Sequence, residues 1–146
     1  MKHLISSLAF VIAVAALATP AFAQQSGALR VEFQGPGGHS SGAYGRVSAL
    51  HAAARTVILI QKALPAGSYQ ITNLTGGNSV NAIASDGLIE LKLTAANADA
   101  YRLLVEAVTK AAAEGAATEN AFRGVKPGDL TSGAPATVRS KVTPLK

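Results

Sequence analysis

Hydrophobic residues in this chain follow two different spacings, and the order in which they alternate restricts the folds that it can adopt. Residues 28–35 read ALRVEFQG, where Leu29, Val31 and Phe33 alternate with polar residues. A period of two is typical of a strand with one buried face. A segment with helical spacing follows it, so the chain is expected to combine a sheet with helices.

Two segments have the spacing of amphipathic helices. The first is predicted over residues 44–64 with Ser41 as N-cap, and the second begins after Asn97 as N-cap and ends at Gly115. The apolar stripes are formed by Val47, Leu50, Ala54, Val57 and Ile58 in the first and by Tyr101, Leu104, Val105, Val108 and Ala112 in the second. Both helices therefore have one face that must pack on a core.

Further extended segments complete the pattern. Strands are predicted at 68–77 and 88–95, an extended segment at 79–85, a hairpin turn at Asp86–Gly87, and a last strand at 121–127. The order strand, helix, strand, strand, helix, strand predicts an α+β fold. Its architecture is a ferredoxin-like βαββαβ two-layer sandwich, an antiparallel sheet with two helices on one face.

The two ends of the chain differ from this body. Residues 1–23 have a positive start, an apolar stretch and small residues at Ala21 and Ala23, which predicts a secretory signal peptide and a periplasmic or secreted protein. The alternative, an uncleaved membrane anchor, is disfavoured because the apolar stretch is short. Residues 24–127 are expected to form one domain, free of the membrane after cleavage, and residues 128–146 a flexible basic tail.

Composition excludes several functions. The chain has no cysteine, so neither a disulfide framework nor a thiolate zinc site can form. The formal charge is +5, but residues 24–120 contain seven Lys or Arg and seven Asp or Glu, so the excess lies at the ends. A basic tail without interleaved aromatic residues and without a recognition motif does not indicate nucleic-acid binding.

Two glycine-containing motifs carry a resemblance to a known family. Residues 35–46 read GPGGHSSGAYGR and residues 74–83 read LTGGNSVNAI, on either side of the first predicted helix. In this order they resemble the lid, or dimerisation, domain of the co-catalytic zinc metallopeptidases, which include carboxypeptidase G, succinyl-diaminopimelate desuccinylase and the aminoacylases. The resemblance covers residues 29–115.

The resemblance implies roles for three residues. His39 would correspond to the histidine that enters the partner subunit's active site and stabilises the developing oxyanion, a suitable task for an imidazole. Asn81 and Gly77 would contact the substrate. The alternative is that His39 is an exposed loop residue without a role and that Asn81 caps backbone groups. Ser40 and Ser41 are poor candidates for a nucleophile with His39 as base.

The family's zinc chemistry is not expected in this chain. A dinuclear zinc site needs several His and carboxylate ligands and a glutamate base. After residue 23 the histidines are His39 and His51, and His51 is expected on the surface of the first helix. The sequence also has Lys92–Leu93–Thr94 where the family often places an arginine. We therefore expect no enzyme activity, no metal and no cofactor.

The leading hypothesis is a secreted, non-catalytic, stand-alone dimerisation domain. It would form a homodimer through the first helix and an edge strand, as the resemblance implies. Three alternatives remain open: an accessory subunit that lends His39 in trans to a metallopeptidase catalytic domain, a remnant of a truncated peptidase gene, and a small-ligand or peptide binder on the open sheet face.

Overall fold

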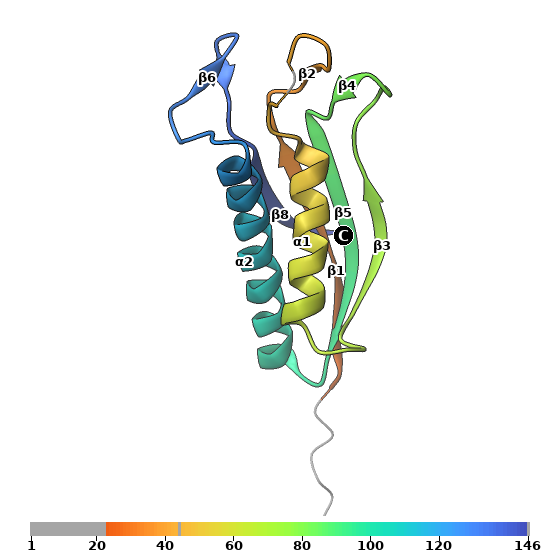
Figure 1. Ribbon diagram of the computed structural model, residues 1–146. Coiled ribbons are helices and arrows are strands. Elements are labelled where there is room, and N and C mark those ends of the chain that lie inside the picture. Colours follow the sequence, from red (N-terminus) through yellow and green to blue (C-terminus); the bar gives the residue numbers. More distant parts are fainter. Residues whose placement is uncertain (1–22, 44, 146) are drawn as a thin grey trace, which may run out of the picture.

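The computed structural model describes residues 23–43 and 45–145 (Figure 1). Apart from Ala23, the predicted signal peptide lies outside the described residues. The elements are β1 (Gln25–Gln34), β2 (Gly38–His39), α1 (Ala49–Ala63), β3 (Tyr69–Thr75), β4 (Ala82–Ile83), β5 (Asp86–Ala95), α2 (Ala98–Phe122), β6 (Leu130–Thr131), β7 (Ala134–Pro135) and β8 (Arg139–Leu145). Figure 1 shows the two helices side by side over one face of the sheet, with β2, β4 and β6 at one end. We call this end the tip.

The main sheet has the strand order β3-β5-β1-β8, and all its pairings are antiparallel. Val31 of β1 pairs with Ile89 of β5 on one side and with Val142 of β8 on the other. The alternating residues of β1 and β5 that face the helices are buried, whereas their neighbours form a polar open face. The predicted α+β fold, an antiparallel sheet with two helices on one face, is confirmed.

The two helices are in close contact at Gly115, which does not end α2 as predicted. Gly115 is buried inside the helix, and a Cβ atom there would collide with the Thr56 side chain and lie 3.0 Å from the Ala52 carbonyl oxygen. The helix therefore continues to Phe122. Glycine at this position permits close packing of two helices, which outweighs its low helix propensity.

The start of α1 was also predicted incorrectly. The N-cap is Ser48, whose side-chain oxygen accepts a hydrogen bond from the backbone N–H of His51 at 3.3 Å, and the helix begins at Ala49. Ser41 lies in the preceding loop. The predicted hairpin turn at Asp86–Gly87 is also wrong, because both residues belong to β5 and pair with β1. Glycine serves a different purpose here: a Cβ at Gly87 would lie 2.5 Å from the Ala49 carbonyl oxygen.

The last strand lies further along the chain than predicted. The segment 121–127 contains the end of α2 and a turn, whereas residues 139–145 form β8, hydrogen-bonded to β1. The described part of the expected flexible tail thus contributes a strand to the main sheet. The sequence obscured it because β8 buries few apolar groups, Val142 among them, and intersperses them with Arg139, Lys141 and Pro144.

We predict that Gly115→Ala lowers the free energy of unfolding by about 1–3 kcal/mol, the usual cost of overpacking a close contact. Urea denaturation followed by circular dichroism measures the change. Gly42→Ala is the matched control, since a Cβ at Gly42 meets nothing within 4 Å. Equal midpoints for the two variants would contradict the proposed tight helix contact.

Candidate functional site

The structure brings the two predicted site residues His39 and Asn81 together at the tip. They lie on the short strands β2 and β4, where His39 pairs with Ala82 and Gly38 pairs with Ile83. The backbone N–H of Ser40 donates to the Asn81 carbonyl oxygen at 2.9 Å. Nε2 of His39 is 3.0 Å from Nδ2 of Asn81, although the residues are 42 positions apart. The two polar side chains therefore form one exposed pair.

The loop before His39 is shaped by its glycines. Gly37 and Gly38 have φ values of 64° and 146°, which L-residues with a side chain rarely adopt. A Cβ at Gly37 would lie 2.8 Å from the Ser85 side chain, and one at Gly38 would lie 2.6 Å from that of Ala43. On the other side of the ring, Nδ1 of His39 is 2.7 Å from Oγ of Ser41. The imidazole is thus held at both nitrogens.

Gly77, the third predicted site residue, lies apart from this pair in the turn after β3. Its φ is 74°, and it lines a cleft of about 640 Å³ above the first turn of α1. Arg46, His51 and Arg123 line the same cleft. His39 and Asn81 are not among its lining residues. The predicted site residues are therefore divided between an exposed pair and a neighbouring cleft.

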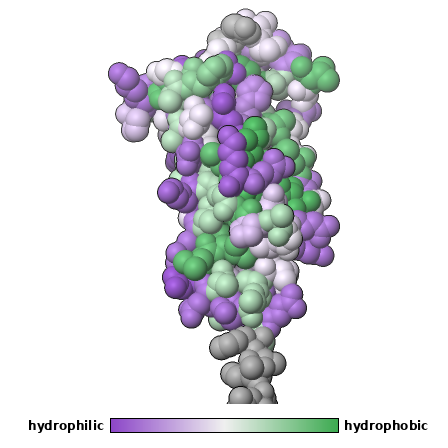
Figure 2. All heavy atoms as spheres, turned by 60° about the horizontal axis from the view of Figure 1, so that its bottom comes forward, coloured by the Kyte–Doolittle hydropathy of each residue, from purple (hydrophilic) through white to green (hydrophobic). Residues whose placement is uncertain are grey.

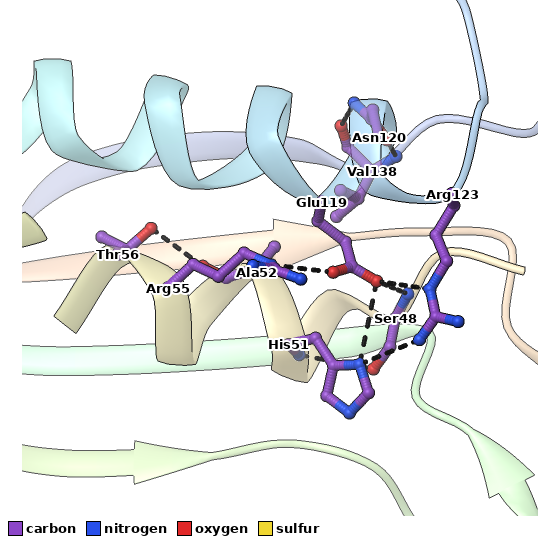
Figure 3. Close-up of polar contacts among 9 residues, drawn as sticks. All are labelled: Ser48, His51, Ala52, Arg55, Thr56, Glu119, Asn120, Arg123 and Val138. Atoms are coloured by element: carbon purple, nitrogen blue, oxygen red, sulfur yellow. Dashed lines mark hydrogen bonds and ion pairs between the residues drawn. The ribbon is translucent and has the colours of Figure 1, made fainter. Parts of the chain in front are cut away.

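Beside the cleft, a buried glutamate joins the two helices (Figure 3). Glu119 of α2 is 0% exposed. One of its oxygens accepts from the backbone N–H of Ser48 at 3.1 Å and from Nε of Arg123 at 3.2 Å, and the other accepts from Nε of Arg55 at 3.0 Å. Nδ1 of His51 lies 3.8 Å from the same carboxylate. The carboxylate therefore connects the end of α2 to the start of α1.

These contacts determine the charge state of the glutamate. Burial raises the pKa of the Glu119 carboxyl group, but the hydrogen bonds from the Ser48 N–H, Arg55 and Arg123 outweigh burial and set that pKa below its ordinary value. Glu119 is therefore a structural anion. An ionised carboxylate with three donors is not available as a proton donor at neutral pH.

The next residue anchors the returning chain. The side-chain amide of Asn120 donates to the carbonyl oxygen of Val138 at 3.0 Å and accepts from the N–H of Val138 at 2.8 Å. Val138 immediately precedes β8, so this pair of bonds fixes where the last strand enters the sheet. Consecutive side chains, Glu119 and Asn120, thus hold α1 on one side and β8 on the other.

Sequence reasoning missed this arrangement. His51 lies at the helix surface, as expected, but no acidic residue stands within a helical turn of it in the sequence, because Glu119 is 68 positions further along the chain. One signal was present: Glu119 recurs at helical spacing after Val108, Ala112 and Gly115, on the buried face of α2. A carboxylate in an apolar stripe must have partners. This spacing is recognisable only if the predicted helix continues past Gly115.

Two further observations concern only the described residues. Within 23–43 and 45–145, no three His, Asp or Glu side chains gather closely enough to hold a metal ion. No helix in that part of the chain is both long and apolar enough to cross a bilayer.

Comparison with known proteins places this arrangement in a family. Residues 24–120 match the family model of the peptidase dimerisation domain. The chain belongs to this family. The resemblance expected from the two glycine motifs is thereby confirmed. No curated protein matches the sequence.

Solved structures share the fold of this peptidase dimerisation domain. The aminobenzoyl-glutamate utilization protein from Klebsiella pneumoniae superposes with a TM-score of 0.64 at 16% identity, over 87% of this chain and 31% of that one. A Staphylococcus aureus tripeptidase gives 0.60 at 15% identity, over 83% and 29%. A hydantoinase/carbamoylase family amidase from Burkholderia multivorans gives 0.61 at 17%, over 85% and 28%. The chain thus spans about a third of their length.

We predict that Glu119→Gln destabilises the protein by about 2 kcal/mol at pH 7, because the charge-assisted hydrogen bonds to Arg55 and Arg123 are lost. The folded-state pKa of Glu119 lies below its unfolded value. Its contribution is therefore complete above the unfolded pKa of about 4.3 and disappears as the pH falls through the folded pKa. Urea unfolding from pH 7 to pH 3 measures this dependence.

The matched control is Glu106→Gln, since Glu106 is exposed and paired with Arg102 at 2.7 Å. That substitution should change the stability by less than about 0.5 kcal/mol. The difference in the free energy of unfolding between wild type and Glu119→Gln should become smaller below about pH 4. A difference that stays constant from pH 7 to pH 3 would contradict the conclusion that ionised Glu119 stabilises the fold.

Proposed function

We propose that this protein is an exported, non-catalytic dimerisation module that acts by self-association. Membership of the peptidase dimerisation family supports association, and the secretory pattern of residues 1–23 supports export. The single observation that carries the proposal is an apolar surface between α1 and the edge strand β3. Figure 2 shows hydrophobic residues exposed along the body between hydrophilic ones.

The interface would combine the outer side of α1 with the helix-facing side of β3. Ile58 of α1 is 52% exposed, and Leu74 of β3 is 43% exposed. Leu74 pairs with Ile89 and Ile71 pairs with Leu91, both of which are fully buried, so Leu74 and Ile71 point toward the helix layer. Burying this strip against its own copy would remove apolar area from water in a two-fold arrangement.

The two edges of the sheet are not equivalent, which favours β3 as the pairing edge. β3 reads YQITNLT and carries neither charge nor proline. β8 reads RSKVTPL, and its Arg139, Lys141 and Pro144 are residues that discourage strand pairing at an edge. Antiparallel pairing of β3 with its copy would extend the sheet on one side only. Self-association would then stop at a dimer.

To test this interface we use Ile58→Lys, which places a charge in the centre of the proposed surface. Sedimentation velocity of the wild type at tens of micromolar should show a dimer, and the variant should raise the dissociation constant at least about tenfold by burying an unpaired ammonium. The matched control is Leu103→Lys on α2, where the wild-type residue is 57% exposed and outside the surface. A wild type that stays monomeric, or equal effects of both variants, would refute the interface.

A second function is favoured by the His39–Asn81 pair, because two short strands hold these side chains together at an exposed tip. In this alternative the module lends His39 in trans to a separate metallopeptidase. With such an enzyme co-purified, His39→Ala should lower its kcat about a hundredfold, the usual loss for one oxyanion-stabilising donor. Thr118→Ala, at an exposed position of α2 that takes no part in this pair, is the control. Unchanged kcat in His39→Ala would exclude this role.

A further inference from the structure

The cleft above the first turn of α1 has an unusual charge. Five segments form it: the loop before α1, the first turn of α1, the turn 76–80 after β3, the segment 82–84 with β4, and the end of α2. Arg46, His51 and Arg123 lie in its wall, and none of its described lining residues is Asp or Glu. The basic groups that line the cleft therefore come from separate segments of the chain.

The carboxylate that contacts Arg123 and lies 3.8 Å from His51 does not neutralise these groups. Glu119 is fully buried, and its one negative charge is already shared by the guanidinium groups of Arg55 and Arg123 (Figure 3). Arg46 forms no ion pair with another described residue. Positive charge thus exceeds negative charge at this position even before His51 is counted. An anion in the cleft would be stabilised.

The rest of the wall is apolar or uncharged. Leu50, Val80 and Ile83 contribute hydrocarbon surface, while Asn78 and Ser79 offer polar groups that can fix a ligand's orientation. A volume of about 640 Å³ lies within the range of small-molecule sites. A guanidinium group such as that of Arg46 can bind a carboxylate through two parallel hydrogen bonds. Arg123 already donates through Nε to Glu119 and has Nη2 3.4 Å from Nδ1 of His51, so it offers a ligand its positive charge and Nη1.

We propose that this cleft binds a small organic carboxylate, with the carboxylate at Arg46 and Arg123 and its apolar part against Leu50 and Val80. The N–H groups of Ser48, Ala49 and His51 at the α1 terminus are not available to this ligand, because they donate to Glu119, the Ala84 carbonyl oxygen and the Ser48 side chain. It shares neither Ile58 nor Leu74 with the proposed self-association surface, because these two residues are not among its lining residues.

The test is an NMR titration of the ¹⁵N-labelled protein with 4-phenylbutyrate, compared with the neutral 4-phenylbutyramide. The acid should shift the amide resonances of residues 76–80 with a dissociation constant on the order of a millimolar, as expected for a ligand of this size. The amide should bind at least about tenfold more weakly, because it lacks the charge that guanidinium recognises.

Two variants separate binding from folding. Arg46→Gln should raise the dissociation constant of the acid about tenfold. Arg102→Gln, which replaces a distant arginine on α2, should leave it unchanged. Val80→Glu should leave the fold intact, because Val80 is completely exposed. It should weaken binding of the acid more than binding of the amide, because both lose an apolar contact but only the acid is repelled by the new carboxylate. Sedimentation velocity in the same buffer reports self-association separately, so failure of one proposal is distinguishable from failure of the other.

The proposal is overturned if 4-phenylbutyrate gives no saturable shift at residues 76–80, or if acid and amide bind equally. It is also overturned if sodium sulfate saturates the same resonances as tightly as the acid, since that would indicate a site for any anion. Wild-type affinity in both Arg46→Gln and Val80→Glu would exclude this cleft as the binding site.

Discussion

The buried carboxylate of Glu119 is the interaction on which the geometry of the tip depends. A charge without solvent is costly, so this group must keep its donors, and one of them is the backbone N–H of Ser48. Ser48 is also the N-cap of α1. The carboxylate therefore helps to fix where the first helix begins.

That starting point is transmitted to the candidate site. The N–H of Ala49 donates to the carbonyl oxygen of Ala84 at 3.0 Å, so the start of α1 is tied to the segment just after β4. β4 pairs with β2, and this ladder brings His39 to Asn81. A series of hydrogen bonds thus leads from a buried anion between the helices to an exposed imidazole. Loss of the anion would loosen the tip before it loosened the sheet.

The sequence predicted the parts of this fold that depend on local periodicity. The alternation in β1 and the apolar stripe of α2 identified the layers, and the two glycine motifs pointed to His39 and Asn81, which the structure brings together. The stripe predicted for α1 was wrong, because the helix buries Ala49, Ala52, Ala53, Thr56 and Ile60, whereas Ile58 of the predicted stripe is 52% exposed. Prediction from the sequence failed where a long-range contact decides the outcome. In the sequence Gly115 resembles a helix end, but in the structure its missing side chain leaves room for Thr56. Gly87 resembles a turn residue, but its missing side chain leaves room for the Ala49 carbonyl group. Such contacts leave no local pattern.

The centre of the proposed dimer surface lies below the cleft. Ile58 follows His51, the last α1 residue of the cleft lining, by seven residues, so at 1.5 Å per residue it lies roughly 10 Å down the axis of α1 from the cleft. Leu74, at the other end of the surface, is two residues from Gly76 in the cleft lining, so only this end approaches the tip. Because one carboxylate organises the tip and apolar area drives association, acid would weaken the first before the second. For the proposed dimer, a disordered tip is accordingly the state expected at low pH.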